Sequence, residues 1–123
     1  MRYIHTNIIA RDWKRVADFY IAVFGCTIKP PERNLSGDWL DQATGLTAAA
    51  LRGVHLLLPG YGETGPTLEI FSYEEMVEKQ PSMANHTGFA HIGPVMRTSV
   101  QKSTPISAEA EASVSHRLLL LMR

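Results

Sequence analysis

The sequence predicts a mixed α+β domain whose elements follow the order strand, helix, strand, strand, strand (βαβββ). Two observations carry this prediction. Residues 3–9 and 66–71 alternate apolar and polar side chains, which is the period of a half-buried strand, and residues 47–58 indicate one long or bulged strand. Residues 13–24 instead repeat their apolar side chains at helical spacing.

The helix has clear start and stop signals. Asp12 is a candidate N-cap, and Gly25 is placed to end the helix. Residues 27–29 are then predicted to form a short strand that stops at Pro30 and Pro31. Residues 35–45 indicate a polar loop with a helical turn at 38–40.

The next two strands are predicted from a longer stretch. Residues 47–51 and 53–58 indicate one strand, with Gly53 as a candidate β-bulge. A glycine-rich turn at 59–66 leads into the strand at 67–73. A polar connector follows, and a new strand is predicted at residues 87–93.

The character of the chain changes after Gly93. All nine glycines, all aromatic residues and the single cysteine lie at or before that position. Residues 94–123 are rich in Ser, Thr, Ala and Glu, and residues 107–122 favour either a helix or partial disorder.

Composition excludes several function classes. A chain of 123 residues with 45% hydrophobic content fits one compact domain. Its 12 basic and 12 acidic residues balance and form no basic stripe, so no nucleic-acid partner is expected. No apolar run is long enough to cross a membrane. With one cysteine, Cys26, no internal disulfide can form, and a cytoplasmic location is expected.

Three residues are candidate ligands for a divalent metal ion: His5, Glu69 and His91. Each lies in a short alternating segment, so its side chain can face a cleft while its neighbours pack in the core. Two imidazoles and a carboxylate suit zinc, nickel, cobalt, manganese or iron(II). Their spacing alone leaves the alternatives of a structural histidine and a solvent-facing strand carboxylate open.

Several segments together resemble the vicinal oxygen chelate superfamily, which includes glyoxalase I, methylmalonyl-CoA epimerase, extradiol dioxygenases and bleomycin-resistance proteins. Residues 4–13 resemble its opening strand and helix cap. Residues 17–25 resemble its helix signature, with Phe19-Tyr20 followed by Phe24-Gly25. Residues 68–71 and 89–92 resemble the strands that carry a metal carboxylate and a metal histidine. The resemblance covers about residues 1–93.

The resemblance implies a site and a chemistry. Two βαβββ modules would curl around a cleft, where His5, Glu69 and His91 would be three of four ligands of a divalent metal ion. The ion would chelate two neighbouring oxygens of a small-molecule substrate and stabilise an enediolate or enolate. His55 would be the base, at the strand position where the epimerases carry a glutamate, although a core or surface role is the alternative. Asn7 would orient substrate or water.

The chain also departs from the family pattern. Residues 1–74 match a first module, 75–86 a connector and 87–93 the first strand of a second module, whereas 94–123 form an atypical C-terminal tail. No glutamate after His91 lies in a strand-like context, so the second module is interpreted as incomplete or altered. An incomplete pair of modules would expose sheet edge and apolar surface, and a homodimer is therefore expected.

Four functions compete. The first is a metal-dependent lyase, isomerase or epimerase of the lactoylglutathione lyase or methylmalonyl-CoA epimerase type. The second is an iron(II) extradiol-type dioxygenase, whose carboxylate ligand would come from the part of the second module that this chain lacks. The third is a non-catalytic ligand-binding protein like the bleomycin-resistance proteins, and the fourth is an inactive truncated homologue. His5 and Glu69 together favour the first.

Overall fold

The computed structural model describes residues 1–80, 83, 85–88 and 92–93. The chain divides into two units, Met1–Val77 and Glu78–Arg123, and every helix and strand of the described residues belongs to the first. The candidate ligand His91 and the tail at 94–123 lie outside the described residues, as do residues 89–91 of the predicted strand at 87–93. The division of the chain into two modules therefore stays a prediction.

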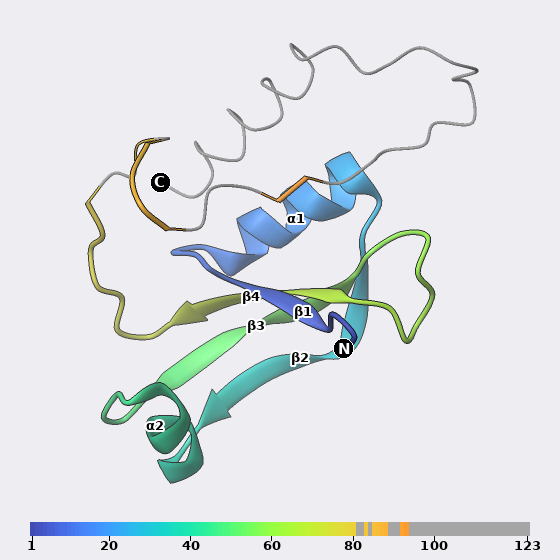
Figure 1. The fold of residues 1–123 in the computed structure, drawn as a ribbon. Coiled ribbons are helices and arrows are strands. Elements are labelled where there is room, and N and C mark those ends of the chain that lie inside the picture. Colours follow the sequence, from blue (N-terminus) through green and yellow to red (C-terminus); the bar gives the residue numbers. More distant parts are fainter. Residues whose placement is uncertain (81–82, 84, 89–91, 94–123) are drawn as a thin grey trace, which may run out of the picture. The chain divides into compact units, whose positions relative to one another are not determined.

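The first unit has the predicted α+β class and contains a four-stranded sheet (Figure 1). Its elements, in chain order, are β1 (His5–Ile9), α1 (Trp13–Phe24), β2 (Thr27–Ser36), α2 (Asp38–Thr44), β3 (Ala50–Leu57) and β4 (Thr67–Tyr73). Within the described residues, no helix has the length and apolar character that crossing a membrane requires.

The strands lie in the order β1-β4-β3-β2. The first strand of the chain is parallel to the last, whereas the pairs β2–β3 and β3–β4 are antiparallel. Because a parallel pair needs a long crossover connection, everything between Ile9 and Thr67 serves to bring β4 back beside β1. The predicted βαβββ order is confirmed.

The helix α1 covers one face of the sheet (Figure 1). The Asp12 side chain accepts a hydrogen bond from the Arg15 backbone N–H at 3.1 Å, and Gly25 ends the helix in the left-handed conformation, as predicted. The core between helix and sheet is apolar. Its buried residues are Ile8, Val16, Ala17, Tyr20, Phe24, Val54, Leu56, Leu68 and Ile70.

The structure corrects the prediction for residues 27–45. The strand β2 does not stop at Pro30 and Pro31 but continues through them to Ser36. It forms an edge of the sheet and pairs with β3 alone. Proline has no backbone N–H to donate, and it is tolerated on an edge strand because one side of that strand needs no hydrogen bonds to a neighbour. Residues 38–44 form a two-turn helix, α2, rather than a loop with a single helical turn.

A second, smaller core lies beside α2. Leu40 of α2 packs with Ala49, Leu51 and Phe71, all of which are buried. The Asp41 carboxylate accepts hydrogen bonds from the backbone N–H groups that lead into β3, at 2.8 and 2.7 Å. Helix α2 is thereby fixed at one end of β2 and β3 (Figure 1).

Gly53 lies in a regular part of β3, so the prediction of a bulge at this residue is wrong. It pairs directly with Phe71, and the register irregularity lies in β2, between Lys29 and Arg33. Glycine is needed at position 53 for another reason. A Cβ atom there would lie 1.9 Å from the Ile70 carbonyl oxygen and 2.4 Å from the Phe71 ring.

We therefore predict that Gly53→Ala destabilises the fold. The added methyl group meets backbone as well as a buried ring, and overpacking of this kind costs about 1–3 kcal/mol or more. Gly45→Ala is the control, because Gly45 has a positive φ but open space around its Cβ position and should cost only about 1 kcal/mol. Urea unfolding measures both free energies, and an equal loss in the two variants would contradict this account.

Tyr20 carries a buried polar atom. The residue is 4% exposed, and its hydroxyl has no hydrogen-bond partner among the described residues. Burial, with a smaller contribution from nearby Cys26, raises the pKa of Tyr20 from 10.0 to about 12. The folded state therefore favours the protonated phenol more strongly than the unfolded chain does.

This shift predicts a pH-dependent loss of stability. The contribution of Tyr20 to the free energy of unfolding is fully present below about pH 10, where the phenol is protonated in both the folded and the unfolded chain. It falls as the pH rises toward about 12. Its full size is on the order of 2 kcal/mol. Tyr20→Phe should remove this part of the pH dependence and leave stability at pH 7 unchanged or higher, whereas the exposed-site control Tyr61→Phe should leave the slope unchanged. Identical slopes for Tyr20→Phe and the parent, in urea unfolding from pH 9 to 12, would refute the prediction.

Candidate functional site

The face of the sheet opposite α1 carries a row of three polar side chains. Asn7 of β1 and His55 of β3 are both register partners of Glu69 on β4, which lies between them. Register partners project to the same face of a sheet, so the three side chains share this face. His5, two residues before Asn7 on β1, projects to it as well.

Glu69 is the centre of the group. Its Oε1 atom lies 3.4 Å from His5 Nδ1 and 3.6 Å from His55 Nε2. Asn7 donates a long hydrogen bond of 3.5 Å from Nδ2 to the other carboxylate oxygen. The side chains of Glu69 and His55 are 17% and 20% exposed, whereas that of His5 is 47% exposed. The Glu69 carboxylate is therefore partly buried and has polar neighbours on both adjoining strands.

The surroundings of His55 favour its neutral form. Burial lowers the pKa of the His55 imidazole, and the charges of Arg33 and Lys29 and the nearby His5 lower it further, while the Glu69 carboxylate acts in the opposite direction. The ring also packs edge-on against Phe71, with centroids 5.8 Å apart. A neutral imidazole has one ring nitrogen with a free lone pair, which can accept a hydrogen bond or a proton.

The spacing of His5 and Glu69 fits two ligands of one metal ion. Donor atoms that each lie about 2.0–2.1 Å from a tetrahedral ion are about 3.3 Å apart, close to the 3.4 Å between His5 Nδ1 and Glu69 Oε1. The part of the chain that the structure describes holds no group of three or more His, Cys, Asp or Glu residues arranged for a metal ion. The described residues therefore supply two of the three predicted ligands, and the third, His91, lies outside them.

Sequence reasoning missed two cations at this face. Lys29 is the register partner of His55, and Arg33 that of Gly53. Their position could not be read from the sequence because the two prolines between them break the strand alternation. The available sequence signal for a charged patch here was the presence of charged residues on both sides of Pro30-Pro31.

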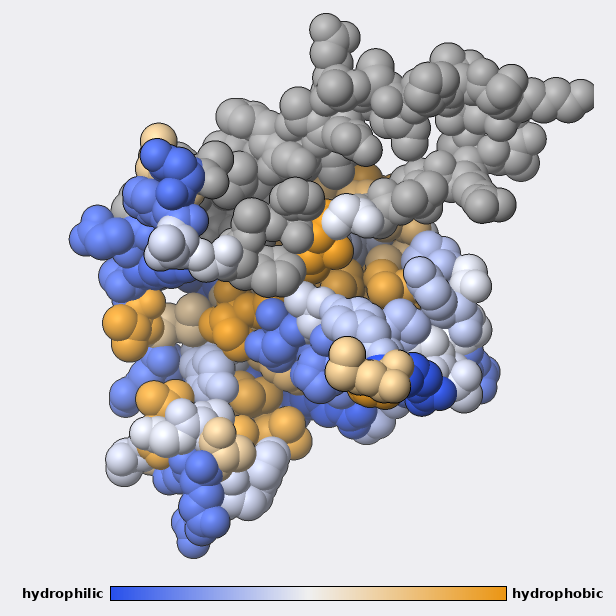
Figure 2. Space-filling view, viewed as in Figure 1, coloured by the Kyte–Doolittle hydropathy of each residue, from blue (hydrophilic) through white to orange (hydrophobic). Residues whose placement is uncertain are grey.

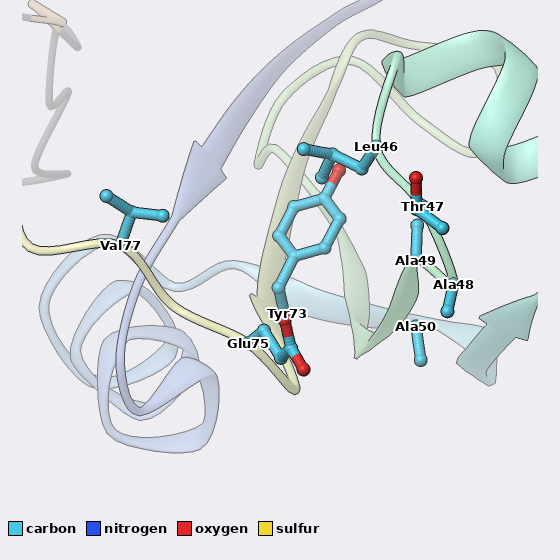
Figure 3. A pocket seen from close by; sticks show the side chains of 8 residues that line it. All are labelled: Leu46, Thr47, Ala48, Ala49, Ala50, Tyr73, Glu75 and Val77. Carbon is cyan, nitrogen blue, oxygen red and sulfur yellow. The ribbon is translucent and has the colours of Figure 1, made fainter.

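A pocket of about 200 Å³ lies elsewhere, beside the start of β3 and the end of β4 (Figure 3). Tyr73, four residues beyond Glu69 on β4, forms part of its wall. Its lining is mostly small or apolar: Leu46, Thr47, Ala48, Ala49, Ala50, Tyr73, Glu75 and Val77. Because none of the candidate site residues lines this pocket, it is separate from the group around Glu69.

Comparison with known proteins identifies the fold. The structure of the chain is similar to the crystal structure of a glyoxalase family protein from Bacillus cereus, with a TM-score of 0.61 and 14% sequence identity. The match covers 72% of this chain. The chain has a glyoxalase-type fold.

The glyoxalase-type fold agrees with the resemblance seen in the sequence, and at this identity the likeness concerns the fold alone. The chain spans 58% of the length of the Bacillus cereus protein. No protein-family model matches the sequence, and no curated protein does. The assignment of activity therefore depends on the side chains around Glu69.

Proposed function

We propose that this chain is a glyoxalase-like metal-dependent enzyme, a lyase, isomerase or epimerase acting on a small oxygenated substrate. The observation that carries the proposal is the gathering of His5, His55 and Asn7 around the Glu69 carboxylate on an open sheet face. The glyoxalase-type fold supports it, and the group lies on the side of the sheet that α1 leaves free.

The proposal gives each residue one role. His5 and Glu69 hold a divalent ion together with His91. When bound, the ion would stabilise negative charge that develops on two neighbouring substrate oxygens. His55 takes a proton from the substrate carbon next to those oxygens, and Asn7 orients the substrate. Because His55 lies one strand away from Glu69 and contacts it at 3.6 Å, a base and a charge-stabilising site lie within the span of a small substrate.

Metal affinity tests the ligand assignment. Titration of the purified full chain with nickel, cobalt, zinc, manganese and iron(II) should show one stoichiometric site. His5→Ala and Glu69→Gln should each weaken binding by more than the roughly 10- to 100-fold typical of an outer-shell partner. The matched controls are His86→Ala and Glu74→Gln, whose side chains bond to Met83 and Arg52, and these should bind as the parent does.

The outcomes separate the competing functions. Iron as the tightest metal, with turnover of a catechol, would favour the dioxygenase. Absence of binding by the parent chain would refute the enzyme proposal and favour a ligand-binding protein or an inactive homologue. Equal affinity of His5→Ala and the parent would refute the ligand assignment.

His55 can be tested separately as a base. A His55→Gln variant should lose no more metal affinity than the roughly 10- to 100-fold typical of an outer-shell partner, since the proposal does not make His55 a ligand and a removed ligand costs more. A loss as large as that of His5→Ala would mean that His55, rather than a residue outside the described ranges, completes the ligand set.

We further propose that the chain forms a homodimer in the cytoplasm. On the face that α1 leaves free, Ile9 of β1 is 42% exposed, and on the edge strand β2 Ile28 is 51% exposed. Figure 2 shows hydrophobic residues at the surface among hydrophilic ones on the side of the molecule it presents. Edge strands with exposed apolar residues favour association. The single free cysteine, Cys26, is in keeping with a reducing compartment.

Light scattering at micromolar concentration should therefore give twice the chain mass of 13.7 kDa. Ile9→Lys, which places a charge on this face, should shift the equilibrium toward monomer, whereas Val77→Lys, at an exposed residue beyond β4, should not. A parent chain that remains monomeric would contradict the proposal.

A further inference from the structure

The edge strand β2 brings two cations to the same sheet face as the Glu69 group. Lys29 pairs with His55, and Arg33 pairs with Gly53, which lies two residues before His55 on β3. Partners in an antiparallel pair project to the same face, and so do residues two apart on a strand. Lys29 and Arg33 therefore both belong to the face on which His55 and Glu69 lie.

The register irregularity in β2 makes this possible. Arg33 is four positions after Lys29 on β2, whereas their partners Gly53 and His55 are only two positions apart on β3. The two extra residues are accommodated around Pro30 and Pro31, so the two cations occupy successive positions on the open face. Bulges of this kind commonly re-aim a side chain beside a functional site.

Neither cation is neutralised within the described residues. No carboxylate forms an ion pair with Lys29 or Arg33 there, although both residues are half-buried. The nearest site carboxylate, Glu69, is already contacted by His5 and His55. The charges of Arg33 and Lys29 nevertheless reach the site, since both lower the pKa of His55 after the larger effect of burial. Two partly desolvated cations without an acidic partner favour the binding of an anion.

We propose that Lys29 and Arg33 bind an anionic group of the substrate, a carboxylate or a phosphate. The assignment of this group to a substrate rests on the proposed function; the anion site itself does not. With its anionic end held over β2, a substrate extends across β3 toward His55 and Glu69. Arg33 supplies the planar fork that binds two oxygens, and Lys29 supplies a point charge beside the proposed base. The enzyme would thus select oxygenated substrates that carry a separate negative charge.

Direct binding of small anions tests the site. Inorganic phosphate and malonate are titrated into the purified full chain by calorimetry, at constant ionic strength, with EDTA present so that metal binding plays no part. At least one anion should bind saturably at a single site. The double variant Lys29→Gln/Arg33→Gln should weaken that binding at least about tenfold, the loss expected for charge-assisted hydrogen bonds. Phosphate preferred over malonate would indicate a phosphorylated substrate, and the reverse a carboxylated one.

The matched control is Lys14→Gln/Arg15→Gln, which removes the same two charges from α1, on the other side of the sheet. It should bind the anion as the parent does. Lys29→Arg/Arg33→Lys changes the same two positions but keeps both charges, and it should retain most of the anion affinity. It shows whether substitution at these positions is compatible with folding. The anion site would be overturned if Lys29→Gln/Arg33→Gln and Lys14→Gln/Arg15→Gln lost the same amount of anion affinity, or if the parent chain showed no saturable binding. Because this test excludes metal, its failure is distinguishable from failure of metal binding at His5 and Glu69.

Discussion

The site depends on the parallel pairing of β1 with β4. This pairing places the first strand of the chain beside the last strand of the unit and sets Asn7 opposite Glu69. The antiparallel pairing of β4 with β3 then sets His55 opposite the same carboxylate. A shift of one residue in either register would turn a partner of Glu69 toward the α1 core, because the side-chain period of a strand is two. The buried row of Ile8, Ile70 and Val54 fixes both registers.

The two faces of the sheet have different roles. The α1 face is a mainly apolar core that provides stability, and the Tyr20 hydroxyl is its one buried side-chain polar atom without a hydrogen-bond partner among the described residues. The opposite face is apolar at one end, where Phe71 packs with Leu40 and Leu51, and polar at the other. Phe71 joins the two ends, because it also packs against the His55 ring. The imidazole thus lies between the Phe71 ring and the Glu69 carboxylate. Burial lowers its pKa, and Glu69 acts in the opposite direction.

The sequence predicts those parts of the fold that have strong local signals. Asp12, Gly25 and the spacing of the apolar residues define α1, and alternation defines β4. The same reasoning fails at β2, where an exposed edge strand with two prolines has neither alternation nor a usual strand composition. The alternating segments also identify His5, Glu69 and His55 as candidates, but their convergence follows from register, which no single strand encodes. Lys29 and Arg33 are not identified from the sequence, because they share a face only as a result of two extra residues in β2.

Paramagnetic broadening by Mn²⁺ tests the central claim, that Glu69 gathers a metal-binding site on the open sheet face. In amide NMR spectra of the full chain, substoichiometric Mn²⁺ should selectively broaden the signals of residues near the β1–β4–β3 row, with Asn7, His55 and Glu69 among the first to disappear. The signals of α2 and of the 46–50 turn should persist. Broadening centred on any other part of the chain, or none at all, would contradict the account.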